Sequence, residues 1–260
     1  MLEVRTLSAG YGSLQILSEV SLSAREGQIT VIVGPNGSGK STLLKSIFGL
    51  TRVYSGEIVF DGQNLAGLPP HKIARNGVAY LPQVESVFPT LTIRENLKMA
   101  GYTVKATELT DRISQVSEMF PILQERKARR AHELSGGERQ MLAMSMALVR
   151  NPRLIMLDEP TANLAPKIAA FVLSKIVEIR DKMSLTVVLV EQNAKKALEI
   201  ADRACLLVSG RSIFEDGAKA LLSHPELGKL YLGVALGKQD EKKQVSTESS
   251  DTIRGPPDAK

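Results

Sequence analysis

The clearest chemical signal in the sequence is a glycine-rich run, Gly34-Pro35-Asn36-Gly37-Ser38-Gly39-Lys40-Ser41. It fits the pattern G-x-x-x-x-G-K-[ST], and it joins a strand-like run at 28–33 to a helical run at 41–48. Glycines let the backbone curl so that successive N–H groups converge on phosphate oxygens, and the helix N-terminus adds partial positive charge. In such loops the lysine reaches the outer phosphates and the hydroxyl holds Mg²⁺. The run therefore predicts that Lys40 and Ser41 bind a nucleotide and its metal ion.

Two adjacent carboxylates, Asp158 and Glu159, follow a second apolar run at 154–157. An acid at the end of a buried strand beside a phosphate loop can hold Mg²⁺ through water, which suits Asp158. A carboxylate one residue further on can orient and polarise a water that attacks the outer phosphate, which suits Glu159. The alternative is a surface pair that caps a turn before Pro160. Because the phosphate loop is present, we expect a hydrolytic site.

A third run, Leu134-Ser135-Gly136-Gly137-Glu138-Arg139-Gln140, lies between these two elements in the sequence. Ser135 and the two glycines stand at the start of a predicted helix, a position suited to binding an anion. The same residues fit an ordinary helix cap, because Glu138 follows Ser135 by three positions. The two interpretations are compatible, since a cap would order the ligand-binding end of the helix.

Short apolar runs alternate with helical patterns along most of the chain, which predicts an α/β protein with a mainly parallel sheet. The runs at 29–33 and 155–157 are apolar on both faces, as expected of central strands that helices cover on both sides. The predicted strands are residues 2–7, 20–24, 28–33, 56–60, 78–81, 154–157, 186–190, 204–208 and 212–215.

The middle of the chain differs, because residues 89–150 contain no convincing strand pattern. Helices are predicted at 93–100, 108–119 and 136–149. In the last of these, Leu142, Met146 and Val149 recur at helical spacing and form one apolar stripe. We interpret this segment as a helical subdomain inserted into the α/β core. The tail from about residue 237 is polar and charged and is predicted to be disordered.

Composition limits the classes of partner that the chain can have. Aromatic residues make up 4% of the sequence and tryptophan is absent, which disfavours recognition of single-stranded nucleic acid by base stacking. The formal net charge is +5, from 33 basic and 28 acidic residues, and the short basic runs are typical of solvated helix faces. We therefore expect no nucleic-acid partner.

The sequence also indicates the redox and membrane context. Cys205 is the single cysteine, which excludes an internal disulfide, and its apolar surroundings predict a buried thiol. The three histidines lack acidic or cysteine partners at ligand spacing, so no transition-metal site is expected. No signal segment is evident, and no apolar run approaches the ~20 residues that cross a bilayer. We expect a soluble, intracellular chain that reaches a membrane only through partners.

With these motifs in this order, the chain resembles the ATPase subunits of the ATP-binding cassette (ABC) family, from about residue 2 to residue 233. The resemblance implies a P-loop NTPase fold with a mainly parallel core sheet, an antiparallel N-terminal β part and an inserted helical subdomain. It implies a single ABC ATPase domain over residues 1–236. A RecA-like core would occupy about 1–88 and 151–236, and the helical subdomain about 89–150. In that family two subunits pair head to tail, so that each ATP lies between one subunit's phosphate loop and the other's LSGG run.

The resemblance also implies roles for individual residues. Tyr11 would stack on adenine, and Gln83, in Tyr80-Leu-Pro-Gln83, would contact Mg²⁺ and the attacking water and link the core to the helical subdomain. Without the resemblance, Tyr11 would be interpreted as an ordinary core or surface residue, and Gln83 as a glutamine in a loop without a functional role. Catalytic roles fall to Glu159, Gln192 and Gln83, and contacts with Mg²⁺ to Ser41, Gln83 and Asp158. Contacts with ATP fall to Tyr11, Gly34, Pro35, Asn36, Gly37, Ser38, Gly39, Lys40, Ser41, Thr42, Ser135, Gly136, Gly137 and Glu138.

Two positions depart from the common ABC pattern. Gln192 stands where most members have a histidine, and Ala165 stands where most have an aspartate. Gln192 can donate an amide N–H to a phosphate, but it does not titrate near neutral pH. The departures indicate either impaired hydrolysis or a subfamily norm. We favour a norm, because several phrases resemble the LivF-type second ATPase subunit of branched-chain amino-acid importers: Leu189-Val-Glu-Gln-Asn-Ala194, Gly67-Leu-Pro-Pro-His71, Phe88-Pro-Thr-Leu-Thr92 and Asp61-Gly62.

The resemblance therefore implies an ATP-hydrolysing subunit of an importer for branched-chain or other hydrophobic amino acids. The implied partners are a second ABC ATPase subunit, two membrane permease subunits and, indirectly, a solute-binding receptor. A homodimer and a heterodimer are both open, and the heterodimer is favoured. The chain would lie in the cytoplasm, peripheral on the inner face of the cell membrane. The alternatives are a related urea or short-amide importer, a non-transport ABC protein, and a cassette that does not hydrolyse ATP.

Overall fold

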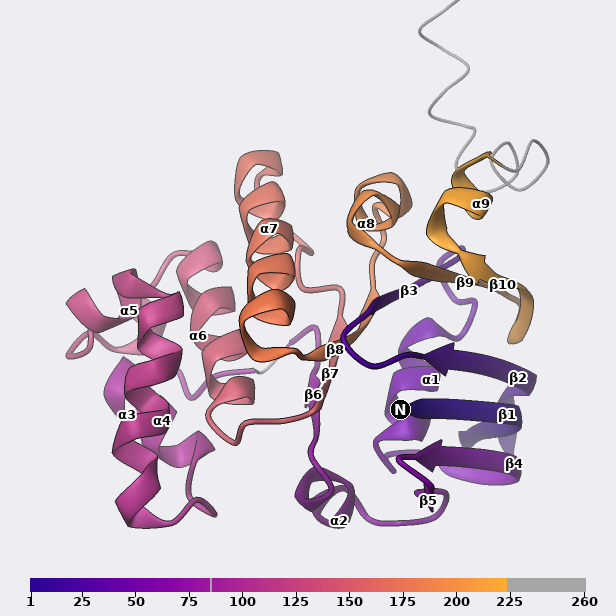
Figure 1. Ribbon diagram of the computed structural model, residues 1–260, viewed down its shortest axis with the longest axis horizontal. Coiled ribbons are helices and arrows are strands. Elements are labelled where there is room, and N and C mark those ends of the chain that lie inside the picture. Colours follow the sequence, from indigo (N-terminus) through magenta and orange to yellow (C-terminus); the bar gives the residue numbers. More distant parts are fainter. Residues whose placement is uncertain (85, 224–260) are drawn as a thin grey trace, which may run out of the picture. The chain divides into compact units, whose positions relative to one another are not determined.

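The computed structural model describes residues 1–84 and 86–223 (Figure 1). Met1–Leu222 form one compact unit that contains two β-sheets. Within the described ranges, no helix combines the length and apolar character that crossing a bilayer requires. The tail predicted to be disordered, at 237–260, lies outside the described residues.

Six strands form the larger sheet, in the spatial order β10-β9-β3-β8-β7-β6. Neighbours from β9 to β6 pair in parallel, and β10 runs antiparallel to β9. The three central strands β3, β8 and β7 are buried at every position, because both faces of the sheet are covered. The strands are β3 (Ile29–Val33), β6 (Val78–Leu81), β7 (Leu154–Asp158), β8 (Thr186–Val190), β9 (Arg203–Val208) and β10 (Arg211–Gly217).

Four antiparallel strands form the second sheet, in the order β2-β1-β4-β5. Its inward side chains share one apolar core with α1 (Lys40–Ile47), so this sheet supports the helix that follows the phosphate loop. Each fully buried leucine, isoleucine or phenylalanine there stabilises the fold by roughly 1.5–3 kcal/mol. The strands are β1 (Leu2–Tyr11), β2 (Leu14–Ala24), β4 (Arg52–Phe60) and β5 (Gln63–Asn64).

Helices occupy the middle of the chain. In residues 89–150 the structure has no strand, and one isolated bridge joins Thr92 to Arg130. The four α-helices of this segment contact one another, and Figure 1 shows them gathered beside α7 (Pro166–Met183). They are α3 (Ile93–Ala100), α4 (Ala106–Met119), α5 (Pro121–Glu125) and α6 (Gly136–Leu148), with a 3-10 turn at Ala131–Glu133. The remaining helices are α2 (Pro70–Arg75), α8 (Ala194–Ile200) and α9 (Ala218–Ser223).

Several elements differ from the sequence-based expectation. β2 begins at Leu14, six positions before the predicted start, and β5 was not predicted at all. Residues 13–15 and 61–64 are exposed, so no apolar run marks them, and their pairing partners across the sheet decide their structure. Of the stripe predicted for α6, Leu142 and Val149 are buried and Met146 is half-buried. Leu148 is buried as well, so the inward face of the helix is broader than predicted.

Candidate nucleotide-binding site

The phosphate loop leaves the carboxyl end of β3 and enters α1 at Lys40. Two of its glycines have no room for a side chain. A Cβ on Gly34 (φ 152°) would lie 2.0 Å from the carbonyl oxygen of Leu207, and one on Gly39 (φ 100°) would lie 2.8 Å from Cδ2 of Leu17. Glycine is therefore required at both positions for the loop to pack against β9 and β2.

The Lys40 side chain is folded back into the loop. The residue is 5% exposed, and its Nζ donates to the carbonyl oxygens of Gly34 and Pro35, at 3.0 Å each. Burial lowers the pKa of Lys40, and the carboxylates of Glu159 and Asp158 oppose that shift. The structure thus places the predicted lysine within the electrostatic reach of both predicted carboxylates.

Ser38 gives an independent indication that the loop fits an anion. The residue is 3% exposed, and within the described part of the chain its hydroxyl oxygen is buried with no hydrogen-bond partner. A buried hydroxyl without a partner costs free energy. A phosphate oxygen held in the loop would accept this missing hydrogen bond, so the residues present fit a bound phosphate.

Asp158 ends β7 beside the first turn of α1. The residue is 4% exposed, its Oδ1 accepts from the Ser41 hydroxyl at 2.9 Å, and its Oδ2 accepts from the Tyr80 hydroxyl at 3.1 Å. Burial, and then the charge of Asp158, raise the pKa of Tyr80, so its hydroxyl remains a donor. Hydroxyl and carboxylate oxygens are the hard ligands that Mg²⁺ prefers, so the Ser41–Asp158 pair fits such an ion.

Glu159 begins a sharp turn after β7. Its φ of 49° lies in the left-handed region, which is unusual for a residue with a side chain. The Glu159 N–H donates to the carbonyl oxygen of Val190 at 2.9 Å, and its Oε2 accepts from the Gln83 side-chain amide at 3.0 Å. Gln192 is exposed and follows β8, which neighbours β7, so it stands at the same end of the sheet. A carboxylate positioned in this way can orient a water molecule.

Tyr11 ends β1 and is 44% exposed. The turn that follows is held by Tyr54, whose hydroxyl donates to the carbonyl oxygens of Gly12 and Leu14, at 3.1 and 3.2 Å. An exposed aromatic ring on a fixed turn can stack on a base. Thr42, by contrast, is buried in the first turn of α1.

The run that includes Ser135 forms the start of α6. The Ser135 side chain accepts from the Glu138 N–H, and Oε2 of Glu138 accepts from the Ser135 N–H at 2.9 Å, which confirms the predicted capping box. The backbone bond from Ser135 is the main reason that the pKa of Glu138 is lowered. Gly137 is buried against α7, where an added Cβ would lie 2.6 Å from Cγ2 of Ile168.

The two helix starts that were predicted to bind anions, at the phosphate loop and at Ser135, form separate clusters in the described residues. Across the described residues, no hydrogen bond or ion pair joins the run 135–138 to the phosphate loop 34–41. The carboxylate of Glu138 instead pairs with Arg126, which lies between α5 and the 3-10 turn. The sequence motifs thus gather into one cluster around Lys40 and a second around Ser135.

Two residues of the first cluster were not predicted. Tyr80 lies in β6, where it reads as part of an apolar strand, and its contact with Asp158 depends on the pairing of β6 with β7. Glu191 directly follows β8 and is 3% exposed. The available signal was its position, since it repeats on β8 the strand-then-acid pattern that marks Asp158 on β7.

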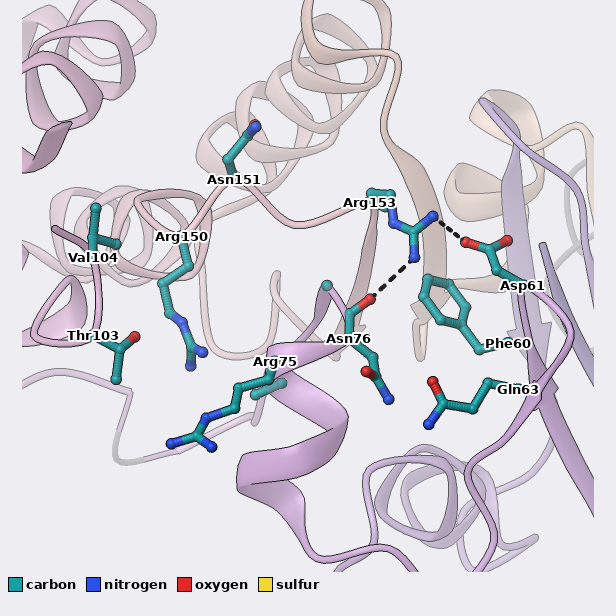
Figure 2. A pocket seen from close by; sticks show the side chains of 12 residues that line it. Phe60, Asp61, Gln63, Arg75, Asn76, Thr103, Val104, Arg150, Asn151 and Arg153 are labelled. Atoms are coloured by element: carbon teal, nitrogen blue, oxygen red, sulfur yellow. Dashed lines mark hydrogen bonds and ion pairs between the residues drawn. The ribbon is translucent and has the colours of Figure 1, made fainter.

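The cavity in Figure 2 is a different site. Its volume is about 920 Å³, and its lining includes Gly77 and Arg153, which stand directly before β6 and β7. It therefore lies at the amino ends of these strands, opposite the phosphate loop. Arg153 lines this pocket, pairs with Asp61 and donates to the carbonyl oxygen of Asn76 at 3.2 Å, as Figure 2 shows. Through these two interactions, Arg153 links the residues before β7 to the ends of β4 and α2.

Known proteins resemble this chain along most of its length. A family profile described as "ABC transporter" matches residues 17–162. The probable branched-chain amino acid transport ATP-binding protein LivF of Archaeoglobus fulgidus is 52% identical over 234 residues, which cover 90% of this chain and 99% of that protein. The high-affinity branched-chain amino acid transport ATP-binding protein BraG of Pseudomonas aeruginosa is 42% identical over 233 residues, covering 90% and 100%. A crystal structure of the ADP conformation of an ABC-transporter ATP-binding cassette matches with TM-score 0.81 and 27% identity, covering 90% and 98%.

Proposed function

The chain belongs to the ABC transporter family as an ATP-binding subunit, and we propose that it powers an importer of branched-chain or other hydrophobic amino acids. Its ABC ATPase domain binds and hydrolyses ATP. The proposal on the solute is carried by one observation: two relatives named for branched-chain amino acid transport match 90% of this chain at 52% and 42% identity. As a domain, we assign residues 1–236 to the cassette, with the helical subdomain at about 89–150.

The roles proposed for the first cluster follow from its geometry. The N–H groups of the loop 34–41 and the Lys40 ammonium bind the phosphates, and Ser38 donates its unpaired hydroxyl to them. Mg²⁺, when bound, would neutralise phosphate charge, and Ser41, Asp158 and Gln83 are the residues that would hold it. Thr42 would contact the bound ATP from the first turn of α1, and Tyr11 would stack on the adenine.

Glu159 orients and polarises the attacking water, and Gln83 helps to position it. The 3.0 Å hydrogen bond between their side chains supports this assignment, because it holds the two groups together, and the charge of Glu159 acts on Lys40 of the phosphate loop. Gln192 would donate an amide N–H to the outer phosphate from the end of β8. It cannot act as a proton carrier, since an amide does not titrate near neutral pH.

The second cluster would serve a nucleotide bound by another subunit. Ser135, Gly136, Gly137 and Glu138 form an ordered helix start. The capping box uses the N–H groups of Ser135 and Glu138, and those of Gly136 and Gly137 would be available to a ligand. In the described residues, none of the four makes a hydrogen bond or ion pair with the chain's own phosphate loop. A head-to-tail dimer supplies the missing partner for both clusters. Gln192 stands where most members of the family have a histidine, which favours a heterodimer with a sister ATPase that carries the histidine.

Coupling to two membrane permeases would pass through the segment that follows Gln83, and the chain would then sit on the inner face of the membrane. The later part of this segment is fixed to α3, because Asn96 is fully buried and bonds the backbone of Phe88, Leu91 and Thr92. A cavity lined by Gln83, Val84, Pro89 and Arg139 opens beside it. The solute-binding receptor would contact the permeases and not this chain.

Transport by the reconstituted complex tests the proposal. The chain is co-expressed with the permease, receptor and second ATPase subunits of an amino-acid ABC importer and reconstituted into liposomes with ATP inside. We expect receptor-dependent uptake of labelled leucine that Lys40→Ala abolishes. Uptake of urea or acetamide in place of leucine would move the chain to a related importer, and ATP-driven efflux would reject the importer direction.

A further inference from the structure

A buried carboxylate outside the predicted set contacts the turn that carries Glu159. Glu191 is 3% exposed at the carboxyl end of β8, and its Oε1 accepts from the backbone N–H of Thr161 at 3.1 Å. Thr161 lies two positions after Glu159, in the connection between β7 and α7. The carboxylate therefore holds the turn at Thr161, through its backbone N–H and with a further hydrogen bond from its side chain.

This turn holds an unfavourable backbone conformation. Glu159 and Asn163 have φ values of 49° and 61°, and for residues with side chains each such conformation is strained. Strain of this kind persists only where neighbouring structure enforces it. Here two bonds do so, to the last residue of β8 and to the residue that follows it: Glu159 N–H to the Val190 carbonyl at 2.9 Å and Thr161 N–H to Glu191 at 3.1 Å.

Burying a carboxylate to hold a turn costs desolvation free energy. Burial raises the pKa of Glu191, its bonds with Thr161 and the Gln192 backbone act in the opposite sense, and the nearby charge of Glu159 raises it further. An apolar residue in this place would avoid the desolvation cost and would often stabilise the fold. Because the carboxylate lies beside the turn that carries Glu159, its position indicates a role in hydrolysis and not in stability.

We propose that Glu191 is a positioning residue for ATP hydrolysis, which fixes the turn 159–163 through the Thr161 N–H and so aims the Glu159 carboxylate at the attacking water. The inference rests on the proposed role of Glu159 and deepens it. Glu191 does not touch nucleotide in this role, because it acts through the backbone of the turn. Nucleotide affinity should therefore be independent of it, and the catalytic rate should depend on it.

Two substitutions of similar size distinguish the effect of losing the hydrogen-bond acceptor from the effect of changing the side-chain volume. Glu191→Gln keeps a side-chain oxygen that can accept from Thr161, whereas Glu191→Leu fills the space without an acceptor. In the assembled transporter we expect the Leu variant to lose about tenfold to a hundredfold in kcat, because small misplacements of a catalytic group have effects of that size. The Gln variant should stay within about threefold of wild type, and both should keep the KM for ATP.

A control at the other end of the sheet removes a bond from a carboxylate to a backbone N–H, together with one ion pair to Arg180. Asp202 accepts from the backbone N–H of Ile29 at 2.8 Å, at the amino end of β3 and away from the phosphate loop. Asp202→Ala should lower Tm but leave kcat unchanged. An equal fall in kcat in this control would mean that general loosening, and not positioning, explains the Leu variant.

Several outcomes overturn the inference. A Leu variant with wild-type kcat, a Gln variant as slow as the Leu variant, or a raised KM in place of a lowered kcat would each do so. If the Leu variant does not fold, hydrogen exchange of the Thr161 amide decides instead: it should be protected in wild type and in the Gln variant, and exposure in wild type contradicts the proposal.

Glu159→Gln is assayed in parallel. Retained turnover there rejects the role of Glu159, whereas lost turnover with a fully active Leu variant rejects only the role of Glu191.

Discussion

The side-chain amide of Gln83 donates a hydrogen bond to Oε2 of Glu159, at 3.0 Å, across 76 positions of sequence. The bond joins the end of β6 to the turn after β7, and these strands are neighbours in the parallel sheet. Because Gln83 also begins the segment that leads to α3, this hydrogen bond connects Glu159 to the part of the chain for which we propose permease coupling.

Glu159→Gln should bind ATP and fail to turn it over. The amide keeps the size of the side chain but cannot polarise water as a carboxylate does, so we expect kcat to fall by about 10²-fold or more. Phosphate release measures the loss, and light scattering should show ATP-dependent association of the subunits. Undiminished turnover would remove Glu159 from its assigned role.

Tyr80→Phe should weaken the response to Mg²⁺ while leaving the fold intact. The substitution removes only the hydroxyl that donates to Asp158, and the remaining ring still packs against Phe48, at 5.5 Å between ring centroids. Loss of an outer hydrogen bond to a metal-holding group typically weakens metal affinity about tenfold. The Mg²⁺ concentration for half-maximal nucleotide binding should rise accordingly.

Tyr54→Phe is the matched control for that experiment. Its hydroxyl holds the turn after Tyr11 and has no contact with Asp158. We expect a higher KM for ATP with an unchanged Mg²⁺ requirement. If both variants shift the Mg²⁺ requirement equally, the hydrogen bond to Asp158 is not the cause.

Gln192→Ala should slow hydrolysis and Gln192→His should not. A hydrogen bond to a charged phosphate is worth ~1.5–3 kcal/mol, so its loss corresponds to about tenfold or more in kcat. Histidine restores a ring N–H donor at the same place. Steady-state ATPase assays of the assembled transporter check this, and full activity of the alanine variant would exclude hydrogen bonding by Gln192 as a contributor.

Lys40→Met should abolish nucleotide binding and raise the Tm of the nucleotide-free chain. Burial lowers the folded-state pKa of Lys40 below its unfolded value, so the protonated lysine destabilises the folded state at every pH below that folded pKa. The difference in Tm between variant and wild type should therefore shrink as pH rises towards 10.5, the ordinary lysine value. Differential scanning fluorimetry at pH 7 to 10 measures it, and a difference that grows with pH contradicts the assignment.

Cys205 should resist thiol reagents in the folded protein. It is fully buried in β9, and burial raises its pKa to about 12, so no useful fraction of thiolate exists at pH 8. Mixing with a disulfide reagent should release no chromophore until guanidinium unfolds the chain, after which one equivalent should react. Rapid reaction without denaturant would show that β9 opens.

The parts of the site that could be predicted are those whose signal is continuous in sequence. Lys40 and Ser41 belong to a contiguous loop flanked by its own strand and helix, and Asp158 ends a wholly apolar strand. Each element dictates its local geometry, because strand, glycine turn and helix start follow one another within a few residues. The capping box at Ser135 was predictable for the same reason.

The remainder depends on which strands become neighbours. Tyr80 meets Asp158 because β6 pairs with β7, and Glu191 reaches Thr161 because β8 lies on the other side of β7. No spacing in the sequence encodes that order. The same limit explains β5, whose exposed residues form a strand only because β4 offers a partner.

Gly137 and Ile168 meet without space for a methyl group, which gives the molecule a mechanical property. Ile168 lies in the first turn of α7, directly after the strained connection from Glu159, and Gly137 lies in the first turn of α6. Close-packed contacts transmit displacement rather than absorb it. A displacement of this connection would therefore be passed to the start of α6, which in the proposed head-to-tail dimer lies against the nucleotide of the partner subunit.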